Sequence, residues 1–164
     1  MDKPEPIKVV AGVIQSELGL KDDQVLVVNQ LFPIPSDDRL YLALRLLGAR
    51  TFAARSEFVD GVEIQHVNRQ EMYSITLYSA SSEARTRNWE VPAALKSIQC
   101  QQAQESNSMK VADIPAVMFD ISEQDGTQRL NKFTLTVNAL VAYRKEKPVE
   151  YYDKFAQPKI YSNP

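Results

Sequence analysis

The chain has 164 residues, 44% of them hydrophobic and 24% charged, with a net charge of −2 at neutral pH. This composition is typical of one globular domain with its own core, and the near-zero charge gives no general electrostatic reason to bind nucleic acid or an anionic membrane. The single cysteine excludes an internal disulfide, and no apolar run approaches the ~20 residues that a membrane-spanning helix needs.

The first predicted element is an amphipathic helix that begins at Pro6. A proline suits the first turn of a helix, because the N–H that it lacks would have no partner there. Gly19 suits the left-handed conformation that ends many helices. Between them, apolar residues recur every three or four positions: Ile7, Val10, Ala11, Ile14 and Leu18. Residues 1–6 lack the basic and apolar regions of a signal peptide, so we expect no targeting segment.

The next stretch predicts a short strand, an extended connector and a long antiparallel hairpin. Residues 25–28 are apolar and mostly β-branched, which favours a strand. The prolines within residues 32–35 lack N–H donors and restrict the residue before them, so this segment is a connector. Residues 39–79 alternate in polarity around Asp60-Gly61, a dipeptide of tight turns. Because the alternation is irregular before that dipeptide, we expect a long or bent tip.

Behind this hairpin, which ends near Ser79, the pattern changes to that of a helix. Ser81 and Ser82 carry hydroxyl groups that can accept hydrogen bonds from the first turn of a helix. The apolar residues then fall on one helical face: Val91, Ala94, Leu95 and Ile98. Pro92 interrupts this stretch. Either the helix bends there, which we favour because the apolar spacing continues across it, or residues 82–89 form a separate turn and the main helix starts near Val91.

The last third of the chain predicts a second hairpin. Residues 117–121 favour a strand, residues 123–127 favour a turn, and residues 129–144 alternate along the longest strand. The apolar face of that strand consists of Phe133, Leu135, Val137, Ala139, Val141 and Tyr143. No helix or strand period continues beyond Lys145.

The order of these elements predicts a single α+β domain. The sheet is mostly antiparallel and is built from two long hairpins, and two helices pack on one of its faces. We expect this domain to span residues 1–146. Residues 147–164 are then an extended C-terminal arm, because their prolines resist regular structure.

No catalytic, cofactor-binding or metal-binding residue is predicted. The chain has one histidine, His66, in phase with the apolar residues of a strand, and one cysteine, Cys100, within the second helix. A packed or surface histidine and an inert thiol are the favoured interpretations, and one residue of each kind cannot build a zinc site without carboxylates. The glycines are too scattered for a phosphate-binding loop, so we expect neither an enzyme nor a cofactor.

Arginines offer the first candidates for an interface between subunits. They lie along the first hairpin and at the start of the second helix: Arg39, Arg45, Arg50, Arg55, Arg85 and Arg87. Two interpretations are open, a solvated surface or a salt-bridged contact with a neighbouring subunit, because arginine is enriched at interfaces. On the second interpretation the candidate residues are Arg45, Arg50 and Arg55.

Aromatic residues in the predicted arm offer further candidates. Tyr151, Tyr152 and Phe155 lie in a segment without periodicity, and aromatic side chains favour interfaces. We expect them to anchor the arm along a neighbouring subunit or ring. The alternative is that the arm folds back over its own sheet.

A resemblance to a known family rests on four segments: residues 29–35, 81–91, 129–143 and 150–153. In these segments the chain is similar to the neck and tail-terminator proteins of long-tailed bacteriophages, and the likeness covers about residues 7–153. The resemblance implies a tail-terminator-like fold and a structural protein of the virion, assembled in the host cytoplasm. Such a protein forms a ring, usually of six subunits, that caps the last ring of the tail tube, ends its polymerisation and joins it to the head connector.

The partners that the resemblance implies are other copies of the chain, the tail tube protein, the head–tail connector or adaptor and, in a sheathed tail, the sheath. Genomic DNA passes through the ring without being read, and no membrane is involved. Two alternatives stay open. One is another head–tail adaptor or collar protein, with twelve subunits. The other is a small enzyme or ligand-binding domain, which would show a pocket lined by convergent polar groups.

Overall fold

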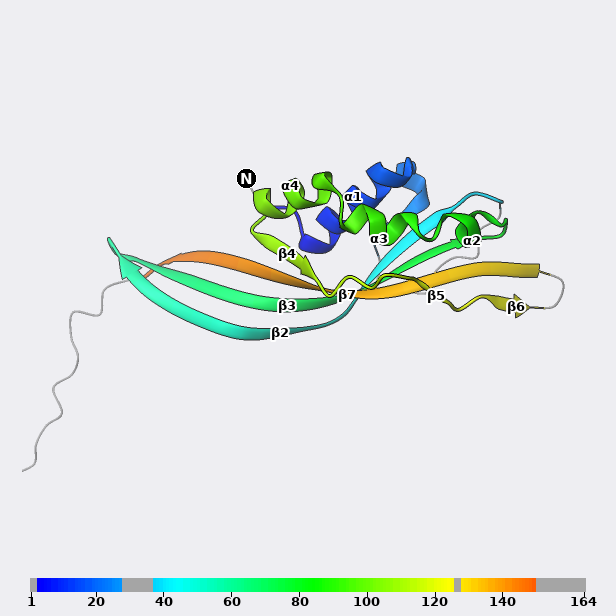
Figure 1. Cartoon of the computed structure of the whole chain (residues 1–164). Coiled ribbons are helices and arrows are strands. Elements are labelled where there is room, and N and C mark those ends of the chain that lie inside the picture. Colours follow the sequence, from blue (N-terminus) through cyan, green and yellow to red (C-terminus); the bar gives the residue numbers. More distant parts are fainter. Residues whose placement is uncertain (1–2, 28–36, 126–127, 150–164) are drawn as a thin grey trace, which may run out of the picture.

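The computed structural model describes residues 3–27, 37–125 and 128–149, and its helices lie together on one side of a long sheet (Figure 1). The helices are α1 (Pro6–Leu18), α2 (Glu83–Arg87), α3 (Glu90–Leu95) and α4 (Ile98–Ser106), with a 3-10 turn at Asp22–Gln24. The strands are β1 (Val25–Val27), β2 (Tyr41–Val59), β3 (Val62–Ser79), β4 (Met109–Ala112), β5 (Phe119–Asp120), β6 (Glu123–Asp125) and β7 (Gln128–Pro148).

The sheet has the strand order β1-β2-β3-β7-β4, and β5 and β6 pair with other parts of β7. Its long pairs, β2 with β3 and β3 with β7, are antiparallel. One edge differs, because β1 pairs with residues 42–44 of β2 in parallel. The chain between these two strands is too long for a tight turn, and such a connection lets two strands run in the same direction. The mixed α+β class is therefore as expected, but the sheet is not purely antiparallel.

The first helix matches its prediction at both ends and on its buried face. Pro6 is the first residue of α1, and Gly19 ends it with a left-handed φ of 67°. The N–H of Leu20 donates to the carbonyl of Gln15 (3.0 Å), a hydrogen bond that closes such a helix end. Of the apolar residues predicted to share one face of this helix, four are at most 4% exposed: Val10, Ala11, Ile14 and Leu18.

The second predicted helix is three short helices rather than one bent helix. Pro92 lies in the first turn of α3, where its missing N–H leaves no helical hydrogen bond unmade. A second break follows α3, and the side chain of Ser97 caps α4 by accepting from the N–H of Cys100 (3.1 Å). The helix layer thus contains four α-helices among the described residues, and the prediction of two was wrong.

Because of the break before α4, the four apolar residues predicted to lie on one helical face do not all do so. Ile98 is 72% exposed, whereas Leu95 is 1% exposed. The prediction that Ile98 shares the buried face was therefore wrong, because a helical period does not continue across a break. Val91, Ala94 and Leu95 belong to the core on the sheet, which includes Leu42, Leu44, Tyr73, Ile75, Leu77, Leu135 and Val137.

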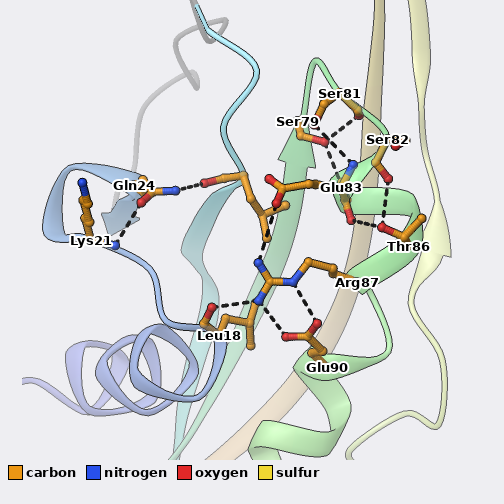
Figure 2. A network of polar contacts seen from close by, with 12 residues as sticks. Leu18, Lys21, Gln24, Ser79, Ser81, Ser82, Glu83, Thr86, Arg87 and Glu90 are labelled. Carbon is orange, nitrogen blue, oxygen red and sulfur yellow. Dashed lines mark hydrogen bonds and ion pairs between the residues drawn. The ribbon is translucent and has the colours of Figure 1, made fainter.

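A polar network joins the helix layer to the end of β3 (Figure 2). Ser79 accepts a hydrogen bond from the N–H of Ala84 (2.9 Å) and donates one to the carbonyl of Ser81 (2.8 Å). Ser81 accepts a longer one from the N–H of Glu83 (3.3 Å), while Ser82 makes no side-chain cap. The main cap of α2 is therefore Ser79, which the sequence analysis assigned only to the strand.

Arg87 links three of the helices in this layer, because it lies at the end of α2 and contacts α1 and α3 (Figure 2). Its guanidinium donates to the carbonyl of Leu18 at the end of α1 (2.8 Å) and to both carboxylate oxygens of Glu90 (2.8 Å each). Arg39 is likewise paired inside the chain, with Asp23 (2.7 Å) and with Asp37 (2.8 Å). These two arginines therefore have intramolecular roles.

The first hairpin spans nearly the residues predicted, from Tyr41 to Ser79, and its strands are more regular than predicted. Asp60 and Gly61 both have a positive φ (50° and 80°), as in a type I′ turn. The irregular alternation comes from two shifts of register that leave Leu47 and Phe52 as extra residues, as β-bulges do. The prediction of a long or bent tip was wrong, because the strands continue past both bulges to a two-residue turn.

Both strands of the predicted second hairpin differ from the prediction. The strand predicted at residues 117–121 is reduced to β5, and residues 123–125 form β6 instead of a turn. β7 extends beyond the predicted strand at both ends, and its predicted apolar face packs into the core from Phe133 to Val141.

β7 extends into the segment that was predicted to be the arm. Lys147 and Pro148 still pair with β3, so the sheet includes the first two residues of the segment assigned to the arm. The candidate residues Tyr151, Tyr152 and Phe155 lie outside the described residues, as does the connector at 32–35.

Candidate assembly surface

Three strands continue past the helix layer and form a separate region of the sheet (Figure 1). We call residues 50–59, 62–70 and 140–148 the extension; they belong to β2, β3 and β7, and they meet the turn at Asp60-Gly61 at the tip. The rest of the described chain, which holds the helices and the core, is the body. The extension is joined to the body by the continuous strands, by the pairing of β4 with Leu140 and Val141, and by a hydrogen bond from Tyr143 to Glu71.

The extension presents apolar side chains to solvent. Every residue of β2 from Arg45 to Val59 is exposed, whereas Leu42 and Leu44 are 0% exposed. The exposed large apolar residues at the extension and its base are Leu46, Leu47, Phe52, Phe58, Val59, Met72, Leu140 and Tyr143. Apolar side chains that gather on an exposed surface mark sites of interaction with another molecule.

Most of both outer edges of the extension is open among the described strands. β1 pairs with β2 only at residues 42–44. β4 pairs with β7 at residues 138–141, and the N–H of Ala142 donates to the carbonyl of Ser108 (3.1 Å). An edge strand without a neighbour presents unpaired N–H and C=O groups to any strand that approaches. The extension therefore offers main-chain as well as apolar contacts.

The predicted interface arginines, Arg45, Arg50 and Arg55, all lie on the exposed part of β2. Their partners on β3 are Ser74, Gln70 and His66. These positions alternate with Tyr73 and Ile75, which face the core, so the three arginines lie on the face away from the helices. None of the three forms an ion pair with another described residue, and Arg50 donates a hydrogen bond to Gln70 (2.9 Å).

A buried carboxylate marks the point where the extension leaves the body. Glu71 is 6% exposed, and the hydroxyl groups of Tyr73 and Tyr143 both donate to it (2.5 and 2.7 Å). Burial, with the hydrogen bond to Glu71, raises the pKa of Tyr143 to about 12 and also raises that of Tyr73. The guanidinium of Arg69 lies 5.8 Å from the ring centre of Tyr143. The sequence analysis missed this cluster, although a charged residue in phase with Tyr73 and Ile75 was a signal for it.

The single histidine and the single cysteine lie in different regions. His66 lies on the extension, with Nε2 3.0 Å from Oε1 of Glu57, and this hydrogen bond lowers the pKa of Glu57. Cys100 is 1% exposed within α4, and burial raises the pKa of its thiol. The described part of the chain has no group of three or more His, Cys, Asp or Glu side chains that could hold a metal ion.

Comparison with known proteins adds little. No family model matches the chain, and no curated protein matches it. Among solved structures, it has a weak likeness to the sheath/tube terminator of PVC, an extracellular contractile injection system, in the extended state. The TM-score is 0.32 and the sequence identity 13%, over 99% of this chain and 67% of that chain. A TM-score this low does not establish a shared fold. No helix within the described residues has the length and apolar character to cross a membrane.

Proposed function

We propose that this protein is a structural, non-enzymatic component of a phage-type tail that assembles into a closed ring of identical copies. The observation that carries the proposal is the extension, whose apolar side chains are exposed and whose two edges are mostly open among the described strands. Such a surface promotes association, which an isolated protein has to avoid. The exposed surface of the extension therefore suits a protein that works as part of an assembly.

The two edges of the extension belong to different strands, and this difference supports a ring. Contact between β2 of one copy and β7 of another is head to tail. Head-to-tail contacts close into a ring when the rotation between copies permits, whereas contact of one surface with itself stops at a dimer.

Within this class we propose the role of tail terminator. The ring, of six copies, sits at the head-proximal end of the tail, ends the tube and joins it to the head connector; in a sheathed tail it also meets the sheath. The resemblance of residues 81–91 and 129–143 to terminator and neck proteins supports this role. Genomic DNA passes through the lumen without sequence recognition, and the protein belongs to the virion.

Copy number separates this proposal from its alternatives. Native mass spectrometry and electron microscopy of the purified full-length chain, alone and with tail tubes, measure it directly. Six copies in a ring at the head-proximal end of the tube are expected. Twelve copies would favour a head–tail adaptor or collar protein, and a monomer under both conditions would overturn the ring.

The predicted aromatic anchors, Tyr151, Tyr152 and Phe155, belong to the same proposal. β7 ends at Pro148, at the tip of the extension, so the predicted arm departs from the point farthest along the sheet from the body. We expect deletion of residues 150–164 to leave the melting temperature of the monomer unchanged and to prevent the joining of heads to tails. A large fall in that melting temperature would instead assign the segment to the fold of its own subunit.

A further inference from the structure

We propose that neighbouring copies join edge to edge, with residues 54–59 of β2 in one copy paired in parallel with residues 143–148 of β7 in the next. The inference rests on the proposed ring, and it adds which edges meet and in which direction. The sheet of the extension would then continue from one copy into the next.

The two open edges have similar lengths. The bulge at Phe52 interrupts the regular register of β2, so the regular part of its open edge is residues 53–59. β4 occupies the edge of β7 as far as Val141, and the N–H of Ala142 donates to the carbonyl of Ser108, which leaves residues 143–148 open among the described strands. The residues of β2 at the levels of this segment are 54–59.

The two edges also lie at the same level of the sheet. Ala53 and Ala142 both pair with Asn68 of the intervening strand, and Val59 and Pro148 both pair with Val62. Edges at equal levels can meet without a shift along the strands. A contact without such a shift can close into a ring when the rotation between copies permits, whereas a repeated shift gives a helical filament.

The topology determines the direction of the pairing. β2 and β7 both run antiparallel to β3, so they are parallel to each other. Rotation about a ring axis that follows the strands keeps this direction, and β7 of one copy therefore runs parallel to β2 of the next. β1 already pairs in parallel with the same edge of β2, at residues 42–44.

The main chain of β7 directs donors toward this edge. The N–H of Ala142 points outward, because it donates to the carbonyl of Ser108, which precedes the neighbouring strand β4 (3.1 Å). Alternation along a strand then directs the N–H groups of Arg144 and Glu146 outward as well. Pro148 takes the next outward position, where an edge strand tolerates a residue without an N–H.

The charged side chains of the two edges do not by themselves favour the pairing. On the face away from the helices, Arg55 and Arg144 both lie at the level of His66, and Glu57 and Glu146 both lie at the level of Ile64. Like charges therefore lie directly across the joined edges, and opposite charges lie on the diagonals, which long side chains can reach. Within one copy Arg144 already pairs with Glu146 (2.7 Å), so the main chain carries the inference.

A disulfide between copies tests the pairing. Ser56→Cys and Lys145→Cys are combined in a Cys100→Ser background; both positions are exposed, and both pair with Gln65. Within one copy they lie two strands apart, about 9.6 Å, beyond the ~7 Å between Cα atoms that a disulfide can bridge. Mild oxidation of the assembled double variant is expected to give a reducible ladder of species up to the full ring.

The two single-cysteine variants are the controls, and native mass is measured in parallel. A ring that forms without the ladder would overturn edge pairing and leave the proposed function standing, whereas a monomer would contradict both. Dimers from Ser56→Cys alone would overturn the inference in favour of contact between two copies of β2.

A main-chain variant gives an independent test. Glu146→Pro removes an outward N–H and leaves the hydrogen bonds between β3 and β7 in place, while Glu146→Ala removes only the side chain. We expect the proline variant to raise the concentration needed for assembly roughly tenfold, the effect of about 1.4 kcal/mol, with an unchanged melting temperature of the monomer. The alanine variant should have a much smaller effect. Assembly of the proline variant at the parent concentration would count against the pairing.

Discussion

The same three strands have opposite surroundings at their two ends. In the body, Ile75 and its strand partner Leu135 are 0% and 1% exposed beneath the helix layer. In the extension, Arg55 and Arg144 lie exposed on either side of β3. Main-chain pairing continues through both regions, so the difference lies in the side chains and in what covers them.

This difference separates stability from assembly. A sheet of few strands needs a covered apolar face to be stable by itself, and in the body the helices supply that cover. The extension is instead held by strands that begin in the body, and apolar side chains on it such as Phe52 and Leu140 are exposed. Substitutions in the body should therefore change the free energy of unfolding, and substitutions in the extension should change association.

The largest effect is expected in the body, at Leu95. Leu95→Ala removes a fully buried side chain of α3 and should lower the free energy of unfolding by ~2–5 kcal/mol, as large-to-small core substitutions do. Ile98→Ala, three residues away, is the matched control and should cost less than ~0.5 kcal/mol, because Ile98 is exposed. Urea denaturation of the two variants measures both values. Equal losses would show that the break before α4 is misplaced.

The next effect is expected where the two regions meet. Glu71→Ala leaves the hydroxyl groups of Tyr73 and Tyr143 without their acceptor, and a buried polar group without a partner costs ~1–3 kcal/mol. Glu63→Ala, on the same strand and the same face, should leave the denaturation midpoint nearly unchanged. A Glu71 variant as stable as the parent would mean that the cluster does not hold the base of the extension.

Local rules predicted the ends of the first helix in the body and the turn at the tip of the extension. Pro6, Gly19 and the Asp60-Gly61 turn each depend on main-chain conformation within a few residues, and all three were identified correctly. The alternation that marks the buried face of β7 was also visible, because one of its faces is covered and the other is not.

The features that the sequence analysis missed depend on distant residues or on the absence of burial. The hydrogen bond from Tyr143 to Glu71 joins residues 72 positions apart. Every residue of β2 from Arg45 to Val59 is exposed, so the polarity pattern that reveals a strand is weak there, and the bulges at Leu47 and Phe52 disturb it further. The interface role of Arg45, Arg50, Arg55 and the arm residues stays a prediction, since it concerns contacts between molecules.

A smaller effect is expected at the cap of α2. Ser79→Ala removes the acceptor for the N–H of Ala84 and should cost ~0.5–2 kcal/mol, the range for a lost helix cap. Ser82→Ala, which removes the residue expected from sequence, should change stability by less than ~0.5 kcal/mol. Thermal or urea denaturation distinguishes the two. If Ser82→Ala were the more damaging change, the cap would have been assigned to the wrong serine.

The smallest effect on stability, and the largest on assembly, is expected at the arginines of β2. Arg50→Glu replaces an exposed side chain whose hydrogen bond to Gln70 is also exposed, so the denaturation midpoint of the monomer should stay close to that of the parent. In the proposed ring we expect the same side chain to lie near a neighbouring copy, so reversal of its charge should raise the concentration needed for assembly. Lys96→Glu, an exposed change on the helix layer, controls for the change in net charge. Native mass across a range of protein and salt concentrations measures both variants. An unchanged oligomer after reversal of both Arg45 and Arg50 would remove these side chains from the interface, and the contact would then depend on the main chain and apolar residues of the extension alone.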